Sequence, residues 1–189
     1  MIEERRFHFV SRGRLLPAVI FSICGVLLAA PATGAPDYKL IPKLQELKDR
    51  PAAPEFTLSD ANNKKVSLKD YRGKVVFLAF WATWCEFCRE ELPAMERLYR
   101  DYKDQGLEIV AVNIKDKRED ALAFVRKNKL SFLIAMDPEG EIGLLYGAYA
   151  TPTVYLIDRN GIVLARMWGP AGWYSPAARK LIGEIVQMK

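Results

Sequence analysis

Seven consecutive apolar residues, Val75–Trp81, most strongly limit the folds available to this chain of 189 residues. A strand with one face in water alternates apolar and polar residues, whereas an unbroken apolar run is typical of a central strand that helices cover on both faces. Residues 86–105 then carry apolar side chains at helical spacing, and Gly106 stands where a glycine commonly ends a helix. We therefore expect a buried strand that leads within a few residues into a long helix.

Strand and helix patterns continue to alternate towards the C-terminus. We expect a strand at residues 108–112, a helix at 118–128, a strand at 132–135, a short helix at 141–146 and a final helix from Pro176. Strands that alternate with helices are joined by crossovers and run parallel. The middle of the chain therefore predicts a parallel region of sheet.

Hairpins are expected on both sides of this region. Asn160-Gly161 lies between the apolar runs 153–157 and 162–167, and both turn residues tolerate positive φ angles, so these two strands should be antiparallel. Residues 55–68 alternate apolar and polar on both sides of a turn-like segment and predict a second hairpin. The expected fold class is α/β, with a central mixed β-sheet flanked by helices and an N-terminal β-hairpin.

Residues 1–35 have the layout of a signal peptide or signal anchor. Arginines precede an apolar run at residues 15–30, and small residues follow at 32–35. The apolar run is shorter than the about 20 residues of a membrane-spanning helix, so a cleaved signal is our first expectation and an anchor the alternative. Either form would place the protein in the periplasm or at the outer face of the cytoplasmic membrane, with membrane contact only through this segment.

The rest of the chain divides into a short connecting segment and one domain. Residues 36–54 are expected to be a spacer or a short N-terminal helix, because apolar residues recur there at helical spacing before a proline-containing break at 51–54. Residues 55–189 are expected to form the domain, which is long enough for one hydrophobic core.

The histidine and cysteine positions restrict the chemistry. The only histidine, His8, and one of the three cysteines, Cys24, lie in the leader, which leaves Cys85 and Cys88 in the domain. Without an imidazole, hydrolases with a Ser-His-Asp or Cys-His arrangement and histidine-ligated metal centres are excluded. The 28 basic and 23 acidic residues alternate, as at 115–120, which excludes the clustered positive charge of a nucleic-acid binder.

Cys85 and Cys88 lie where the buried strand should end and the long helix begin. The free N–H groups and the dipole at a helix N-terminus favour a thiolate, so Cys85 is expected to attack a disulfide and Cys88 to resolve the product. A zinc site usually needs four ligands, and the domain offers no third cysteine and no histidine, only carboxylates; an inert bridge over so short a loop would contribute little stability. We therefore expect redox catalysis with a Cys85–Cys88 disulfide and with no metal or other cofactor.

Two segments resemble a known family. Residues 80–93, which read FWATWCEFCREELP, and residues 149–158, which read YATPTVYLID, are similar to the two signatures of thioredoxin-fold proteins, in particular the TlpA/ResA-like thiol-disulfide oxidoreductases. The likeness extends from about residue 53 to the C-terminus and includes an inserted strand-helix unit at 108–135. It implies a thioredoxin-like fold, a cis peptide bond before Pro152, and a docking groove bordered by Trp84 and Pro152.

Further site residues follow from position and from this resemblance. Glu86, Phe87 and Thr151 join Trp84 and Pro152 as candidate substrate-binding residues, since the backbone groups of Thr151 can pair with an extended peptide. Relatives commonly have proline where this chain has Phe87. Because the two residues between the cysteines tune the reduction potential, the direction of catalysis cannot be copied from relatives.

Glu91 is a candidate catalytic residue. It follows Cys88 by three positions, so the two side chains share one face of a helix, and a carboxylate there can accept the proton of the Cys88 thiol. The resemblance also places a functional acid at this position, whereas plain thioredoxins use a buried Asp where this chain has Ala79. The alternative is an exposed acid that stabilises the helix dipole, which suits Glu86 and Glu90 better.

The sequence thus predicts an exported thiol-disulfide oxidoreductase that reduces client proteins. By the family resemblance, apo-cytochrome c is one such client, and a membrane thiol donor would reset the enzyme; no nucleic-acid partner is expected. A thiol peroxidase is a second interpretation, although the Pro-x-x-x-Thr-x-x-Cys pattern is missing before Cys85. A thioredoxin-like adaptor that binds partners without turnover is the third.

Overall fold

The computed structural model describes residues 35–188. The predicted leader, apart from its last residue, lies outside the described residues, as do His8 and Cys24. No helix within residues 35–188 combines the length and apolarity needed to cross a bilayer.

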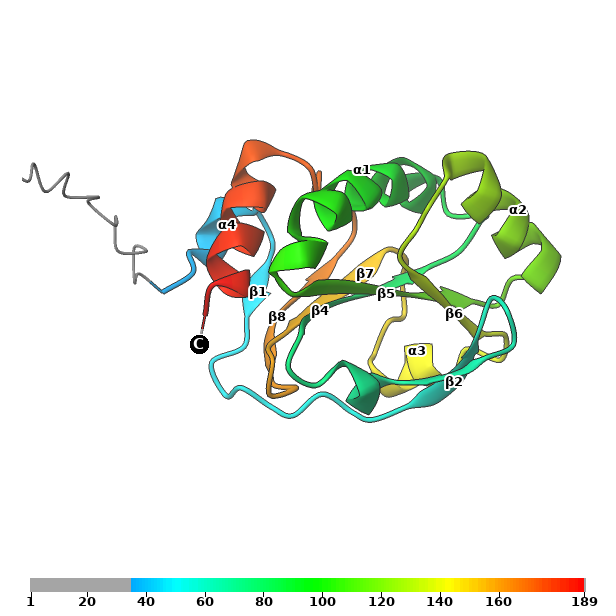
Figure 1. Ribbon diagram of the computed structural model, residues 1–189, viewed down its shortest axis with the longest axis horizontal. Helices are drawn as coiled ribbons and strands as arrows, with labels where there is room; N and C mark the ends of the chain where they lie inside the picture. The colour runs from blue at the N-terminus through cyan, green and yellow to red at the C-terminus, as the bar shows by residue number, and fades with distance from the viewer. Residues whose placement is uncertain (1–34, 189) are drawn as a thin grey trace, which may run out of the picture. The chain divides into compact units, whose positions relative to one another are not determined.

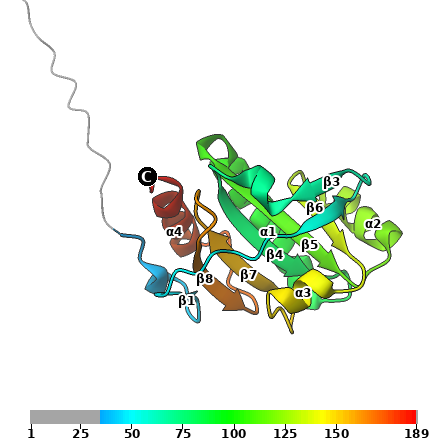
Figure 2. The ribbon, with the colours of Figure 1, turned by 90° about the horizontal axis from the view of Figure 1, so that it is seen from below.

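The described residues form one mixed sheet in the order β1-β8-β7-β4-β5-β6-β2-β3. Figure 1 shows α1 and α2 along one side of this sheet and α3 on the other, and Figure 2 shows β1 and β3 at its two edges. The strands are β1 (Gln45–Glu46), β2 (Thr57–Asp60), β3 (Lys65–Ser67), β4 (Val75–Trp81), β5 (Leu107–Ile114), β6 (Leu133–Asp137), β7 (Thr153–Ile157) and β8 (Val163–Trp168). The α-helices are α1 (Glu86–Tyr102), α2 (Arg118–Asn128), α3 (Glu141–Leu145) and α4 (Pro176–Val186), and short 3-10 helices are η1 (Tyr38–Leu40), η2 (Leu68–Tyr71) and η3 (Lys103–Gln105).

Strand β4 is the centre of the sheet, as its sequence predicts. All seven of its residues are buried, and it pairs parallel with β5 and antiparallel with β7. The parallel pairing continues from β5 to β6 across α2. The predicted crossovers, the central mixed sheet and its flanking helices are therefore confirmed, and the fold is thioredoxin-like.

The predicted turns and helix ends are also confirmed. Strands β2 and β3 form the N-terminal hairpin, and β7 and β8 form an antiparallel pair around Gly161, whose φ of 78° is in the left-handed region. Gly106 follows α1 and η3 with a φ of 98°. Ser175 caps α4 by accepting a hydrogen bond from the Ala178 N–H.

In the connecting segment the structure has a helix of only three residues. Residues 37–50 contain the short η1 and then β1, which pairs with β8 at the edge of the sheet. Pro42 explains the break, because the residue before a proline is forced out of the helical region, and Ile41 has the extended angles φ −110° and ψ 114°. The segment is also more than a spacer, since Tyr38 and Ile41 belong to the buried core.

Candidate active site

The reactive segment is a tight turn between β4 and α1. The Cys85 N–H donates to the Ala82 carbonyl at 3.3 Å, which places Thr83 and Trp84 at the centre of the turn. Cys85 then caps α1, because its sulfur accepts a hydrogen bond from the Cys88 N–H at 3.2 Å. The Cys85 sulfur thus lies at the positive end of a 17-residue helix, where negative charge is stabilised.

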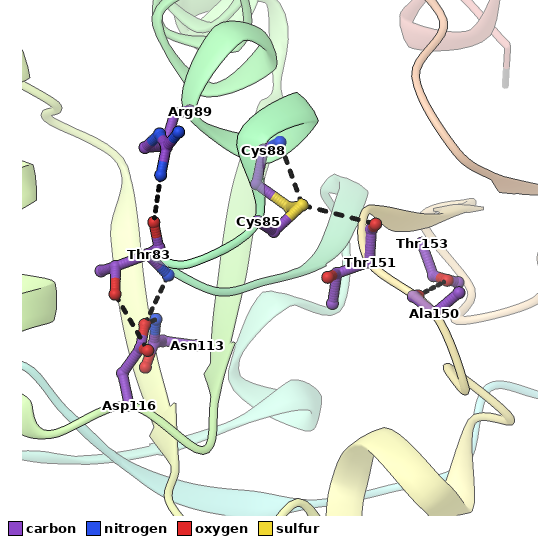
Figure 3. The surroundings of a disulfide bond; sticks show 9 residues. All are labelled: Thr83, Cys85, Cys88, Arg89, Asn113, Asp116, Ala150, Thr151 and Thr153. Carbon is purple, nitrogen blue, oxygen red and sulfur yellow. Dashed lines mark hydrogen bonds between the residues drawn. A yellow bond between two sulfur atoms is a disulfide. The ribbon is translucent and has the colours of Figure 1, made fainter.

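The two sulfurs form a disulfide bond, with the Cα atoms 5.2 Å apart (Figure 3). Cys85 is 7% exposed, whereas Cys88 is 1% exposed and lies inside the first turn of α1. A second molecule can therefore approach Cys85 more easily than Cys88.

The loop before β7 closes the other side of the disulfide. The Thr151–Pro152 peptide bond is cis, in agreement with the family resemblance, and the Thr151 carbonyl oxygen lies 3.4 Å from the Cys85 sulfur. Thr153 pairs with Phe80 of β4, so the sheet holds this loop beside the end of β4. The Pro152 carbonyl accepts a hydrogen bond from the Gly169 N–H at 2.8 Å, which ties the loop to the end of β8.

An apolar groove of about 440 Å³ adjoins the Cys85 sulfur. Four of the five predicted substrate-binding residues line it, namely Trp84, Glu86, Phe87 and Thr151, whereas Pro152 is buried and is not part of the lining. Ile114, Tyr149 and Ala150 complete the lining. The large apolar side chains of the groove are strongly exposed: Trp84 by 62%, Phe87 by 53% and Tyr149 by 82%.

Sequence reasoning missed Ile114 and Tyr149 as groove residues. Ile114 ends β5, the parallel neighbour of β4, and ligands of such sheets bind outside the carboxyl ends of the strands, so this position could have been included. Tyr149 is part of the second signature and lies two residues before Thr151. By contrast, Trp81 fills the core as expected, with its ring 5.5 Å from that of Phe124.

Glu91 is a buried carboxylate on α1, whereas Glu86 and Glu90 on the same helix are exposed. Its oxygens accept hydrogen bonds from the Gly172 N–H at 2.8 Å and the Trp173 N–H at 3.4 Å. These donors belong to the connection between β8 and α4, and the Trp173 ring packs edge-on against Phe77 of β4 at 4.6 Å. Glu91 is therefore fixed inside the protein, three residues after the buried Cys88.

Asp116 contacts the turn that precedes Cys85, a contact that sequence reasoning missed. Its carboxylate accepts hydrogen bonds from the Thr83 N–H, the Thr83 hydroxyl and the Asn113 side-chain amide (Figure 3). In the sequence, Asp116 is one residue of an alternating charged run, which is typical of a solvated surface.

An aromatic cluster supports the loop that carries Tyr149 and Thr151. The Tyr146 hydroxyl donates to the Pro54 carbonyl at 2.5 Å, and the Tyr155 hydroxyl donates to the Tyr146 carbonyl. Burial is the main cause that raises the pKa of Tyr146 well above its ordinary value, and burial also raises the pKa of Tyr155. Both phenols therefore remain neutral donors at physiological pH.

Within residues 35–188, no group of three or more metal-ligating side chains comes together.

Comparison with known proteins points to the same chemistry. Residues 50–166 match the AhpC/TSA family. The chain is 37% identical over 152 residues to the thiol-disulfide oxidoreductase ResA of Bacillus cereus, an alignment that covers 80% of this chain and 88% of that protein. It is 38% identical over 117 residues to ResA of Bacillus subtilis, covering 62% of this chain and 65% of the relative.

A solved structure with the same fold is that of a protein from Chlorobium tepidum described as thiol:disulfide interchange protein DsbE. Its sequence is 38% identical, the match covers 72% of this chain and 94% of that one, and the TM-score is 0.64.

Proposed function

The chain belongs to the AhpC/TSA family and is a ResA-like thiol-disulfide oxidoreductase, and from this we propose that it reduces disulfides of client proteins outside the cytoplasm, with Cys85 as attacking and Cys88 as resolving residue. The observation that carries the proposal is the position of the Cys85 sulfur, which adjoins an exposed apolar groove and caps α1. Cys88 is shielded inside α1 and can meet a client only through Cys85.

The proposed reaction transfers two electrons to the client. The Cys85 thiolate attacks one sulfur of the client disulfide, forms a mixed disulfide and releases the other client sulfur as a thiolate. The Cys88 thiolate then attacks the Cys85 sulfur, which forms the Cys85–Cys88 disulfide and releases the second client thiolate. A dithiol donor at the membrane would reduce this disulfide again.

Glu91 is our candidate for the proton transfer at Cys88. A thiol must lose its proton before it can attack, and general bases are commonly His, Asp or Glu. Glu91 is buried on the same helix and follows Cys88 by three residues, which places the two side chains on one face. The only histidine of the chain is His8.

The groove suits an extended client segment. Trp84, Phe87 and Tyr149 offer apolar contact area, and Thr151 lies in a loop whose backbone can pair with a passing strand. We assign Glu86 to the rim of the groove and Pro152 to the support behind it.

Export is proposed from the composition of residues 1–35, a basic segment followed by an apolar one. The periplasm or the outer face of the cytoplasmic membrane would provide the clients. By analogy with the family, apo-cytochrome c is a client class, because its haem-binding cysteines must be reduced before haem attachment.

The test is a trapping experiment with defined substrates. In a Cys88→Ser variant, the mixed disulfide on Cys85 cannot be resolved, so insulin or an oxidised peptide with a Cys-x-x-Cys-His segment should remain attached to Cys85. Cys85→Ser should form no adduct. If Cys88→Ser forms no adduct although Cys85 is alkylated by iodoacetamide, client reduction is wrong, and rapid peroxide consumption by the same variant would favour the peroxidase interpretation.

A further inference from the structure

We propose that Asp116 is a positioning residue for the reactive cysteine: its carboxylate holds the turn that presents Cys85 to a disulfide substrate. The role concerns the thiol-disulfide oxidoreductase activity and deepens the proposed mechanism. Asp116 lies two residues after β5, in the connection to α2, and Figure 3 shows it below the turn, away from Thr151.

The carboxylate accepts three hydrogen bonds, two of them short. Its Oδ2 accepts from the Thr83 N–H at 2.6 Å and from the Asn113 Nδ2 at 2.6 Å. Its Oδ1 accepts from the Thr83 hydroxyl at 3.0 Å. Hydrogen bonds to a carboxylate are stronger than neutral ones, so this arrangement opposes movement of Thr83.

Thr83 is held from its other side as well. The Arg89 guanidinium, on α1, donates to the Thr83 carbonyl at 3.3 Å. The N–H, hydroxyl and carbonyl groups of Thr83 therefore all form hydrogen bonds. The turn itself contributes only one backbone hydrogen bond, from the Cys85 N–H to the Ala82 carbonyl. Thr83 is therefore more restrained than the turn alone would make it.

The restraint passes from the sheet to the sulfur. Asn113 is fully buried in β5 and pairs in register with Trp81, the last residue of β4. It anchors Asp116, which in turn holds Thr83, two residues before Cys85. A rotation of this turn would move the Cys85 sulfur away from the Cys88 N–H and from the groove, so the contact acts on reactivity through geometry.

A solvated acid in a charged run is the alternative for Asp116. Its neighbours Lys115, Lys117, Glu119 and Asp120 are exposed, as that interpretation requires. Asp116 is instead partly buried and turned towards Thr83.

Two substitutions distinguish the hydrogen bonds from the charge. Asp116→Ala removes all three bonds. Asp116→Asn removes the charge but keeps an oxygen for the two N–H donors, and its amide can donate to the Thr83 hydroxyl oxygen. Asp158→Ala is the matched control, because the Asp158 carboxylate also holds a turn: it accepts hydrogen bonds from two backbone N–H groups at 2.9 Å between β7 and β8. This turn is remote from Cys85, since the adjacent Ile157 pairs with Val76 at the opposite end of β4.

The readouts are the rate at which iodoacetamide alkylates Cys85 in the reduced full chain and the amide exchange of the turn. We expect Asp116→Ala to slow alkylation about tenfold and to speed exchange at Thr83. Tenfold corresponds to about 1.4 kcal/mol, close to the lower end of what a single hydrogen bond to a charged group contributes. Asp116→Asn should stay within about threefold of the wild type in alkylation, as expected when the bonds are kept. Asp158→Ala should alter neither readout.

The proposal is overturned if Asp116→Ala alkylates and exchanges like the wild type, or if Asp116→Asn is slowed as much as Asp116→Ala. If Asp116→Ala does not fold, Thr83→Val is tested in its place, because it removes only the 3.0 Å bond from the Thr83 hydroxyl. Slower alkylation of Cys85 with faster amide exchange would support the positioning role, and unchanged values would overturn it. Should the wild type reduce no protein disulfide while Asp116→Ala still slows alkylation, client reduction fails and the positioning role stands.

Discussion

Replacing Glu91 by glutamine separates a chemical role of this residue from a structural one. The carboxylate holds the connection between β8 and α4 through the Gly172 and Trp173 N–H groups, and we propose that it also accepts the proton of Cys88. Glutamine has nearly the same shape and retains one oxygen as an acceptor, but it cannot take up a proton in this way.

The two roles differ in expected size. A hydrogen bond to a charged group contributes about 1.5–3 kcal/mol and a neutral one about 0.5–1.5 kcal/mol, so Glu91→Gln should lower the free energy of unfolding by about 1 kcal/mol. We count only the 2.8 Å bond to Gly172, because the 3.4 Å bond to Trp173 is long. Loss of a general base typically costs about 10²–10⁴-fold in rate, so resolution of the mixed disulfide should slow at least about a hundredfold.

The assay follows one turnover. Reduced protein is mixed with glutathione disulfide, samples are quenched in acid, and mass spectrometry measures how long the glutathione adduct on Cys85 persists. Urea unfolding of the same variant gives the change in stability.

Glu96→Gln is the matched control on the same helix. Glu96 is 5% exposed against 7% for Glu91, and it too accepts hydrogen bonds, from the Ser131 N–H and hydroxyl and from Arg100, each at 2.7 Å. Its substitution should cost at least as much stability, because it weakens three short bonds, and should leave adduct lifetime unchanged. The proton role of Glu91 is refuted if Glu91→Gln resolves the adduct as fast as Glu96→Gln.

Three further substitutions test other contacts. Arg159→Ala should lower the free energy of unfolding in urea by about 1–2 kcal/mol, because the guanidinium donates to three backbone carbonyls, and an unchanged midpoint would contradict this. Tyr149→Ala should raise the KM for insulin several-fold at constant kcat, because it removes one wall of the groove, whereas an unchanged KM would exclude Tyr149 from binding. Burial raises the pKa of Tyr146 in the folded protein above that of the unfolded phenol, which is about 10. The neutral Tyr146 phenol therefore contributes its full stability below about pH 10, and this contribution is lost as the pH rises further, because the phenol of the unfolded chain ionises first. Between about pH 9 and 11, the urea midpoint of Tyr146→Phe should fall less steeply with pH than that of the wild type. An equally steep fall in both proteins would refute this role of Tyr146.

Local patterns predicted the elements that place the cysteines. The apolar run of β4, the helical spacing of α1 and the Asn160-Gly161 turn are each set by neighbouring residues, and each was confirmed. The cysteine pair could be assigned for the same reason, because its position at the start of a helix is local information.

Contacts between distant residues were not predictable in this way. Glu91 could be placed on the face of Cys88, but its partner Gly172 is 81 residues away. Asp116 meets Thr83 across 33 residues, and only the parallel pairing of β4 with β5 brings their loops together. At residues 37–50 the apolar spacing favoured a helix, but Pro42 and the pairing of β1 with β8 decide the structure.

The turn that carries Cys85 and the proposed proton acceptor Glu91 are both tied to the centre of the sheet, the first through β5 and the second through β4. Asn113, in register with Trp81, anchors Asp116 and thereby the Cys85 turn. Phe77 packs against Trp173, whose segment holds Glu91.

Because these contacts share no side chain, the two substitutions should act on separate steps. In the double variant Asp116→Ala/Glu91→Gln, attack on glutathione disulfide should be as slow as in Asp116→Ala alone, and resolution as slow as in Glu91→Gln alone. Rapid mixing resolves both steps in one experiment. A resolution step slower than that of Glu91→Gln alone would show that the Cys85 turn also positions the sulfur for attack by Cys88, and the separation of the two roles would then be wrong.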